Sequence, residues 1–401
     1  MRSVEEHQRI VAELIAARPS VVVELSDAEG LVLSDDVTAA VSLPIFDNSA
    51  MDGYAVRADD VASATVEDPV KLPVIEDIPA GRTDVPVLEA GTAHRIMTGA
   101  PIPAGATAVV AVEATDARMD IVSINTPSVE GRYIRRAGED VAAGTTVLRA
   151  GQVVRPAVAG LAGALGLPEL TVIPRQRVLV ISTGSELVSP GTPLRAGQIY
   201  ETNSIMLAAA VRQAGCEVVA AVTVNDDVEQ FTAMLDRYAG ASDLIITSGG
   251  VSAGAYEVVK DAFGRAGDQG VEFVKVAMQP GMPQGAGRLD GAAVVTVPGN
   301  PVSALVSFEV FIRPPLRSAM GLPDPERPRH SAVLTEALTA PPGKRQFRRG
   351  IFDAAAGVAV SCGPPGSHHV RWLASANCLL DIPADITEIP AGGQVQIWDL
   401  S

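Results

Sequence analysis

Short polar side chains crowd the segment IFDNSAMDGYA, residues 45 to 55, in a chain of 401 residues that is only 4% aromatic. Asp47 and Asp52 supply two carboxylates, and an amide, a hydroxyl and a tyrosine lie close to them in the sequence. Carboxylates could hold a cation, but Asp-Gly is also a common turn dipeptide of surface loops. Taken alone, the segment favours a surface turn over a functional site, so the choice between the two depends on the rest of the chain.

Further carboxylates lie in or beside small, polar loops. Hard cations such as Mg²⁺ prefer oxygen ligands and keep several waters, so two or three carboxylates would suffice for a metal that bridges to phosphate. Capping of the following helix is the alternative for Asp226 or Asp227. Five histidines and three separated cysteines give poor support for zinc. The candidate carboxylates are Asp52, Asp140, Glu186, Asp226 and Glu257.

Two glycine- or proline-bearing loops could hold a ligand. In TSGGVSAG, Gly249 and Gly250 allow positive φ and a close approach of the backbone, and Ser248 and Ser252 offer hydroxyls to a phosphate. A tight strand-to-helix turn is the alternative. In VPGNPVSA, Pro298 and Pro301 stiffen the loop, and Asn300 could cap the next helix or meet a ligand.

Cations cluster in YIRRAGED and GKRQFRRG. A solvated strand face is the usual position of such a run. In a chain of net charge -16, however, these residues are candidates for holding an anion, and arginine suits bidentate phosphate contact. The six cations are Arg135, Arg136, Lys344, Arg345, Arg348 and Arg349.

Bulk properties exclude several classes of protein. A net charge of -16 argues against nucleic-acid binding, which needs a basic face. Three unpaired cysteine positions fit a reducing cytosol. Two glutamates interrupt the amino-terminal segment, so it is not a signal peptide, and no uncharged apolar run is long enough to cross a bilayer. We therefore expect a cytoplasmic protein.

Strand-like and helix-like segments alternate over residues 175 to 321, beginning with RVLVIS and NSIMLAAAVRQAG. This series predicts a mostly parallel sheet flanked by helices. Ligands of such sheets bind outside the carboxyl ends of the strands, where helix amino termini converge. The loops STGSE, NDD, SGGVS, QPGMP and PGNP follow the five expected strands.

The remaining segments predict two β-rich regions. Short strand-like runs between residues 21 and 175 indicate a β-rich region, and an Ala-rich helix near 155 to 166 belongs to a second unit around it. An amino-terminal helix is expected to begin with a capping box at Ser3 and Glu6. After a proline-rich linker, residues 331 to 401 predict a small all-β domain.

In this order, the motifs resemble the molybdopterin molybdotransferases, the MoeA and gephyrin E-domain family. The resemblance covers nearly the whole chain, and its most specific parts are DNSAMDGYAVR and PGNPVSA. The segments are DNSAMDGYAVR, RIMTGAPIPAGATAVV, RRAGEDV, STGSEL, GQIYETNS, SGGVSAG, PGNPVSA and GSHHVRWLASAN.

The resemblance implies a multidomain α/β plus β protein that acts as a homodimer. A discontinuous elongated domain would span 1–50 and 136–174, an inserted β-rich domain 51–135, a molybdopterin-binding α/β domain 175–321, and a small β barrel 331–401. It also implies a reaction of adenylylated molybdopterin with molybdate that needs Mg²⁺ and gives molybdenum cofactor and AMP. An upstream adenylyltransferase and downstream molybdoenzymes would be its partners.

The resemblance also assigns roles to residues. Asp52, Asp140 and Glu186 would be catalytic, with Asp52 and Asp140 facing the α/β domain of a partner subunit. The metal would bind at Asp226, Glu257 and Glu186. The substrate would contact Thr98, Ser248, Gly249, Gly250, Ser252, Lys275, Pro298, Asn300, Pro301, Arg349 and Ser367.

The chain departs from the family at a few positions. Gln279 and Met282 replace two lysines of a loop that commonly reads KPGKP, while Lys275 remains. Glu257 replaces an aspartate, and Ser185 stands where an aspartate is usual. Two alternatives to a molybdotransferase therefore stay open. One is a paralogue with altered oxoanion use, such as tungstate, and the other is a non-catalytic dimeric scaffold.

Overall fold

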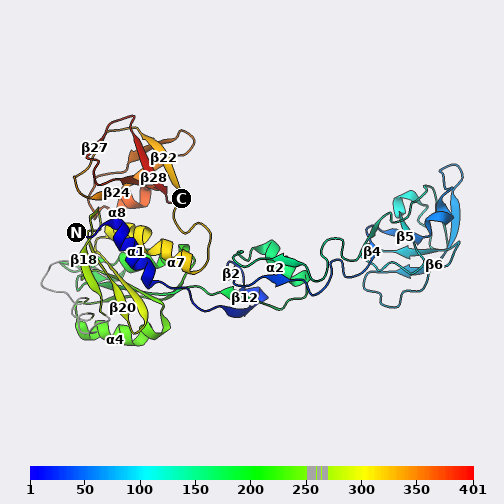
Figure 1. The fold of residues 1–401 in the computed structure, drawn as a ribbon, viewed down its shortest axis with the longest axis horizontal. Coiled ribbons are helices and arrows are strands. Elements are labelled where there is room, and N and C mark those ends of the chain that lie inside the picture. The colour runs from blue at the N-terminus through cyan, green and yellow to red at the C-terminus, as the bar shows by residue number, and fades with distance from the viewer. Residues whose placement is uncertain (251–258, 260–262, 264–269) are drawn as a thin grey trace. The chain divides into compact units, whose positions relative to one another are not determined.

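The structure, a computed structural model, describes residues 1–250, 259, 263 and 270–401. These residues form two compact units, whose elements are labelled in Figure 1. Unit 1 joins Met1–Val22 to Thr171–Ser401, and unit 2 is the inserted stretch Val23–Leu170. The inserted stretch is thus one folded unit placed within the sequence of another.

A six-stranded sheet of order β16-β13-β17-β21-β20-β18 forms the centre of unit 1. The first four strands are parallel, which confirms the mostly parallel sheet predicted from the alternating segments. Central parallel strands are covered on both faces, and this explains the nearly continuous apolar runs in their sequences. Their bounds are β13 Arg177–Thr183, β16 Glu217–Val224, β17 Leu244–Ser248 and β21 Ala292–Val297.

Strand β20, Pro283–Leu289, was not expected from the sequence. It runs antiparallel both to β21 and to the edge strand β18, Glu272–Lys275. A Cβ at Gly285 would lie 2.1 Å from Oγ1 of Thr296, and a Cβ at Gly287 would lie 2.5 Å from the carbonyl oxygen of Gly270. Close packing therefore requires glycines in this inner strand, and those glycines hide its strand pattern.

Helices cover both faces of the sheet. One face packs against α3, α6 and the π-helical turn η6 in a core that includes Leu207, Val302 and Phe311. The other face packs against α4 through Phe231 and Leu235. The bounds are α3 Asn203–Gln213, α4 Val228–Tyr238, α6 Pro301–Ser307, η6 Phe308–Ile312 and α7 Arg313–Ala319.

Helix α1, Val4–Leu14, begins at Ser3, whose hydroxyl accepts a hydrogen bond of 3.0 Å from the backbone N–H of Glu6, as predicted. Its apolar face packs on η6, α7 and β20, and Figure 1 shows it beside α7. Residues 1–22 therefore belong to unit 1, whereas the predicted elongated domain began at residue 1. An amphipathic helix needs an apolar partner, and the α/β domain provides it.

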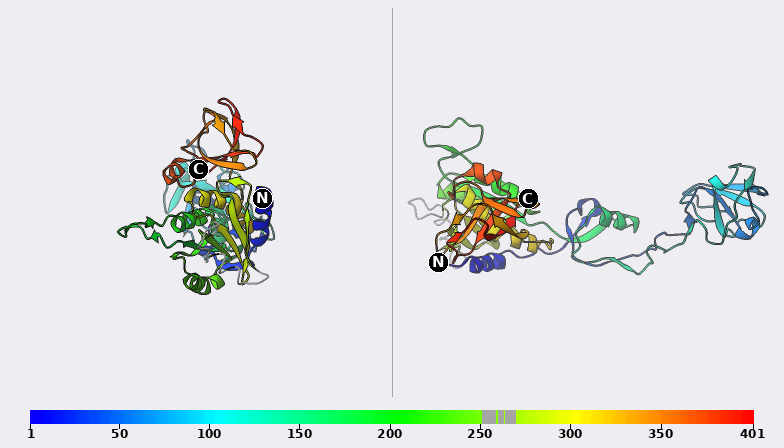
Figure 2. Two further views of the ribbon diagram at one scale, coloured as in Figure 1. Left: turned by 90° about the vertical axis from the view of Figure 1, so that its left-hand side faces the viewer. Right: turned by 90° about the horizontal axis from the view of Figure 1, so that it is seen from above.

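The carboxyl-terminal strands close into a five-stranded barrel, because β24 pairs with both β25 and β26. Figure 1 and the left view of Figure 2 show it, orange to red, at one end of unit 1. The predicted small β barrel is confirmed. Its strands are β22 Arg329–Leu334, β24 Arg345–Asp353, β25 Val358–Ser361, β26 Cys378–Ile382 and β28 Gln394–Asp399, with β23 Leu338–Thr339, β27 Glu388–Ile389 and helix α8 Val370–Ser375 beside them.

A short strand connects the α/β domain to this barrel. Strand β19, Met278–Gln279, runs parallel to the start of β24, and Met278 pairs with Arg345 while Gln279 pairs with Gln346. The backbone N–H of Arg345 also donates to the carbonyl oxygen of Ala277 at 3.0 Å, a normal ladder distance. The QPGMP loop is thus held against the barrel.

Unit 2 contains a five-stranded sheet of order β8-β5-β7-β6-β9 around the buried ring of Tyr54. Its strands are β5 Gly53–Val56, β6 Val70–Ile78, β7 Ala93–Ile96, β8 Ala108–Ala111 and β9 Ile121–Ile124. Two-stranded ladders join β3 Val37–Thr38 to β11 Thr146–Leu148 and β4 Asn48–Ser49 to β10 Ile134–Arg135.

The remaining elements are short. A three-stranded sheet combines β1 Val21–Glu24, β12 Glu169–Ile173 and β2 Val32–Leu33, and helix α2 spans Pro156–Ala164 as expected. In unit 1, β14 Leu187–Val188 pairs with β15 Ile199–Tyr200. Within the described ranges, the helices are all too short or too polar to span a membrane.

Candidate active site

A cavity of about 1050 Å³ opens in unit 1 at the carboxyl ends of the parallel strands. The loops after β13, β16, β17 and β21 all contribute to its lining, as expected for an open parallel sheet. Loop 279–283 and the barrel segments around Lys344 and 365–370 complete the wall. The predicted residues in this lining are Glu186, Asp226, Ser248, Gly249, Gly250, Pro298, Asn300, Pro301 and Ser367.

The turn after β17 brings backbone close to the cavity. Gly249 and Gly250 have φ values of 94° and 64°, a region that favours glycine. A Cβ at Gly249 would lie 2.6 Å from the carbonyl oxygen of Thr183, so a side chain does not fit there. The hydroxyl of Ser248 is buried and shares a hydrogen bond of 3.0 Å with Ser182. Glycine backbone is therefore the ligand-facing part of this turn.

Two predicted site residues, Ser252 and Glu257, lie outside the described residues. Their assignments to substrate and metal stay predictions.

Asp226 and Asp227 have different roles. Asp227 caps α4, because its carboxylate accepts hydrogen bonds from the backbone N–H groups of Glu229 and Gln230 at 2.9 and 3.0 Å. Asp226 instead accepts from the backbone N–H of Ser185 at 3.0 Å, and its own N–H donates to the Ser185 hydroxyl at 3.0 Å. This reciprocal pair fixes Asp226 at the cavity wall.

Two buried polar residues of the cavity, Glu201 and Asn203, were not predicted from the sequence. The carboxylate of Glu201 accepts hydrogen bonds from the N–H and hydroxyl of Ser204 at 2.7 and 2.6 Å. The Asn203 amide donates to the carbonyl oxygen of Gly299 at 2.7 Å, while its Oδ1 is buried and has no hydrogen-bond partner among the described residues. A buried unpaired acceptor at a cavity wall is suited to a ligand donor. The motif GQIYETNS, which contains both residues, was the sequence signal that could have indicated them.

Three carboxylates and one histidine, His368, are the side chains of the cavity lining that could hold a metal ion. Glu186, Glu201 and Asp226 line it, but the described part of the chain contains no cluster of three or more acidic, histidine or cysteine side chains placed to hold a metal ion. Mg²⁺ is commonly held by one or two carboxylates together with waters and substrate phosphates. The residues present therefore fit a magnesium ion that is bound jointly with a phosphate.

The loop after β21 presents the side-chain amide of Asn300 to the cavity. Asn300 occupies the N-cap position of α6, yet its side chain makes no capping hydrogen bond. The amide is therefore available to a ligand, which favours the second of the two roles open for it. Pro301 begins the helix, and the backbone N–H of Val302 donates to the carbonyl oxygen of Ser367 at 3.1 Å. This bond holds the barrel loop beside α6.

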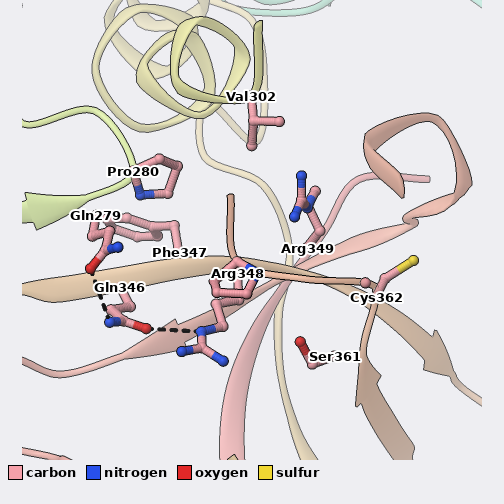
Figure 3. Close-up of a pocket in the computed structure, with 11 residues that line it drawn as sticks. Gln279, Pro280, Val302, Gln346, Phe347, Arg348, Arg349, Ser361 and Cys362 are labelled. Atoms are coloured by element: carbon pink, nitrogen blue, oxygen red, sulfur yellow. Dashed lines mark hydrogen bonds between the residues drawn. The ribbon is translucent and has the colours of Figure 1, made fainter. Parts of the chain in front are cut away.

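Arg349, an expected substrate contact, lines a neighbouring pocket rather than this cavity. It is buried, and its guanidinium donates to the carbonyl oxygens of Gly366 at 3.2 Å, of His369 at 3.1 Å and of Pro364. Burial lowers the pKa of Arg349 from its ordinary value. It lines a small neighbouring pocket with Cys362, drawn in Figure 3. Arg349 thus holds the loop that carries Ser367.

Lys275 also lies away from the cavity. It is exposed on β18 and lines a different surface pocket with Met1, Arg2 and Glu6. Only a few residues separate Lys275 from Gln279 and Met282, which stand where the family commonly has lysines. In the structure, β18 ends before the chain turns into the loop at 279.

Asp52 and Thr98 come together in unit 2. The Asp52 carboxylate accepts hydrogen bonds from the backbone N–H of Thr98 at 2.7 Å and from its hydroxyl at 2.8 Å. Both bonds stabilise the charged form and hold the pKa of Asp52 below its ordinary value. Both residues are exposed, as is Asp140. Arg136, a candidate for anion binding, is paired with Asp47 at 2.6 Å.

Family models match the chain in three parts. MoeA N-terminal region (domain I and II) matches residues 2–166, Probable molybdopterin binding domain matches 179–318, and MoeA C-terminal region (domain IV) matches 331–400.

Two relatives and one solved structure are similar over the whole length. Molybdopterin molybdenumtransferase 2 of Mycobacterium tuberculosis (strain ATCC 25618 / H37Rv) is 70% identical over 405 residues, which covers 100% of both chains. Molybdopterin molybdenumtransferase 1 of the same strain is 37% identical over 99% of this chain and 98% of its own. The crystal structure of a molybdopterin biosynthesis protein from Pyrococcus horikosii has a TM-score of 0.81 at 28% identity and covers 100% and 99% of the two chains.

Proposed function

The chain belongs to the MoeA family and is a transferase of molybdenum cofactor biosynthesis, and from this premise we propose that its chemistry takes place in the cavity of unit 1. The reaction is the insertion of molybdate into adenylylated molybdopterin, with cleavage of the pyrophosphate bond and release of AMP. The observation that carries the proposal is that one cavity combines the Gly249–Gly250 turn with the carboxylates of Glu186 and Asp226.

Each part of the cavity has a chemical task. The glycine turn allows the backbone to approach an oxygen-rich ligand, while Asn203 Oδ1 and the Asn300 amide orient a polar ring system such as a pterin. Glu186 and Asp226 would hold Mg²⁺ against the pyrophosphate. The bound ion would offset negative charge that develops as the phosphoanhydride is cleaved.

We further propose that the site is completed in a homodimer. Asp52 of the partner subunit and Asp140 of the partner subunit would bring two more carboxylates to the pyrophosphate. The exposure of both side chains supports this role, and the lowered pKa of Asp52 favours its charged form. Substrate would come from an upstream adenylyltransferase, and molybdoenzymes would receive the product.

A cytoplasmic location accompanies this function. Cys216, Cys362 and Cys378 are all free and buried, which supports a reducing compartment.

The test is to supply the purified protein with adenylylated molybdopterin, Mg²⁺ and either molybdate or tungstate, and to measure AMP and active cofactor together. AMP and cofactor that appear only with both metal and oxoanion would support the transferase. Tight binding of the pterin without AMP would instead support the non-catalytic scaffold, and a preference for tungstate would support a paralogue with altered oxoanion use.

A further inference from the structure

The cavity is short of positive charge. Among the described residues that line it, three have carboxylates, Glu186, Glu201 and Asp226, and Lys344 is the one lysine or arginine. Adenylylated molybdopterin and molybdate are both anions, so a carboxylate-lined wall alone would repel them. The position of this lysine therefore matters for binding.

Lys344 belongs to a run of four cations, and the other three are engaged. Arg345 forms ion pairs with Asp381 and Glu5, each at 2.6 Å. Arg348 donates to the side chain of Gln346 at 2.9 Å, and Figure 3 shows this bond together with the one from Gln346 to Gln279.

The third engaged cation is Arg349, whose guanidinium is held by the backbone carbonyls of the loop before α8. Lys344 is partly exposed and has no hydrogen-bond or ion-pair partner among the residues that the structure describes. A lysine without a protein partner that lines a cavity is suited to an anionic ligand.

Backbone pairing sets where Lys344 lies. The next residue, Arg345, pairs with Met278 of β19, and Lys344 lines the same cavity as loop 279–283. That loop, QPGMP, contains no charged side chain. The side chain of Gln279 is itself bonded to Gln346 at 3.4 Å. The barrel thus brings a cation next to a neutral loop of the α/β domain.

We infer that Lys344 binds a tetrahedral oxoanion of the reactants, either a phosphate of the pterin or molybdate itself, and supplies the charge that loop 279–283 lacks. This inference rests on the proposed function of the cavity. It makes Lys344 a specificity-determining residue that lies on the barrel rather than on the α/β sheet.

The test compares Lys344→Ala with Lys71→Ala and Lys344→Arg. Lys71 is a matched control, because it is an exposed lysine of β6 that does not line the cavity. One arm measures the molybdate concentration for half-maximal AMP release, and the other measures the Kd of molybdopterin by equilibrium dialysis without molybdate.

In Lys344→Ala we expect one of these two values to rise roughly five- to twentyfold, because a charge-assisted bond to a partly solvated oxoanion is lost. Lys344→Arg should restore most of the lost binding, and Lys71→Ala should match the wild type. A rise in the molybdate arm alone identifies molybdate as the ligand, and a rise in the dialysis arm identifies the phosphate.

Wild-type values in both arms for Lys344→Ala would overturn the inference. Equal losses in Lys344→Ala and Lys71→Ala would overturn it too, since they would reflect overall charge. If the wild type releases no AMP, the proposed function fails, and the dialysis arm still decides whether Lys344 binds the phosphate.

Discussion

At the scale of single residues, hydrogen-bond partners separate side chains of identical type. Asp226 and Asp227 are adjacent and equally able to cap a helix, yet only Asp227 bonds to the first turn of α4. Asp226 is held by Ser185 at the cavity wall. No sequence pattern distinguishes the two, because the difference arises from the loop after a neighbouring strand.

The pairing of Asp52 with Thr98 leads to a prediction about pH. Thr98→Ala should raise the pKa of Asp52 part of the way to its ordinary value, since the hydroxyl bond is lost and the stronger backbone bond stays. Because the folded pKa of this carboxyl is lowered, the bonds stabilise the fold above the ordinary pKa, and that stabilisation is lost as pH falls through the folded pKa. Titration of Asp52 by NMR measures the shift. An unchanged pKa would show that the hydroxyl bond is absent in solution.

At the scale of elements, glycine has two different uses in unit 1. In β20 it permits close strand packing, and in the turn after β17 it provides a backbone conformation. Strand alternation, helix periods and the all-β character of residues 331–401 could be predicted from the sequence, because each repeats a pattern over many residues, whereas the barrel was implied by the resemblance. Strand β20 could not, since Gly285 and Gly287 are required by contacts with distant residues.

Gly249→Ala should weaken binding of molybdopterin and destabilise unit 1 by roughly 2 to 4 kcal/mol, because a clash with Thr183 adds to backbone strain. Gly291→Ala is the matched control, as Gly291 has a φ of 90° but open space around its Cα. Denaturant unfolding and equilibrium dialysis would measure both variants. Equal effects of the two would mean that backbone strain alone, and not the contact, constrains the turn.

The packing of α1 predicts a stability that depends on pH. His7 is fully buried, its ring contacts Phe311 edge to face, and neither ring nitrogen has a hydrogen-bond partner among the described residues. Burial lowers the pKa of His7 from 6.5 to about 4. The unfolded chain therefore binds a proton that the folded chain excludes, and the free energy of unfolding should fall as pH drops from 6.5 toward 4.

His7→Phe should remove that dependence, because the ring stays apolar and cannot titrate. The wild type should lose at most about 3 kcal/mol across this range relative to the variant. Guanidinium unfolding at several pH values compares the two. Parallel curves would indicate that other groups cause any acid sensitivity.

At the scale of the whole molecule, the proposed dimer can be tested by complementation. Asp52→Asn and Asp226→Asn should each form a folded dimer with greatly reduced AMP release. If Asp52 acts on the partner's cavity, a mixed dimer has one intact site, and an equal mixture of the exchanged chains should recover about a quarter of the wild-type rate. No recovery in a mixture that contains mixed dimers would place Asp52 on the cavity of its own chain.

Much of the candidate site could be predicted from loops at the ends of strands, but its boundaries could not. The resemblance suggested substrate contacts for Lys275 and Arg349, and the structure places Lys275 on an exposed edge strand and bonds Arg349 to the loop that carries Ser367. Glu201 and Asn203 were missed because their burial depends on tertiary packing.

The pairing of β19 with β24 has a consequence for how this chain tolerates changes in length. Because the ladder fixes Arg345 beside Met278, the turn PPGK can gain or lose residues before Lys344 without moving that lysine along the cavity wall. A one-residue deletion between Val276 and Met282 would instead shift the register of β19 against β24 by one position. Each side chain of β19 would then point to the opposite face. Loop grafting between related chains should therefore exchange the turn at 340–343 freely and keep 276–283 intact.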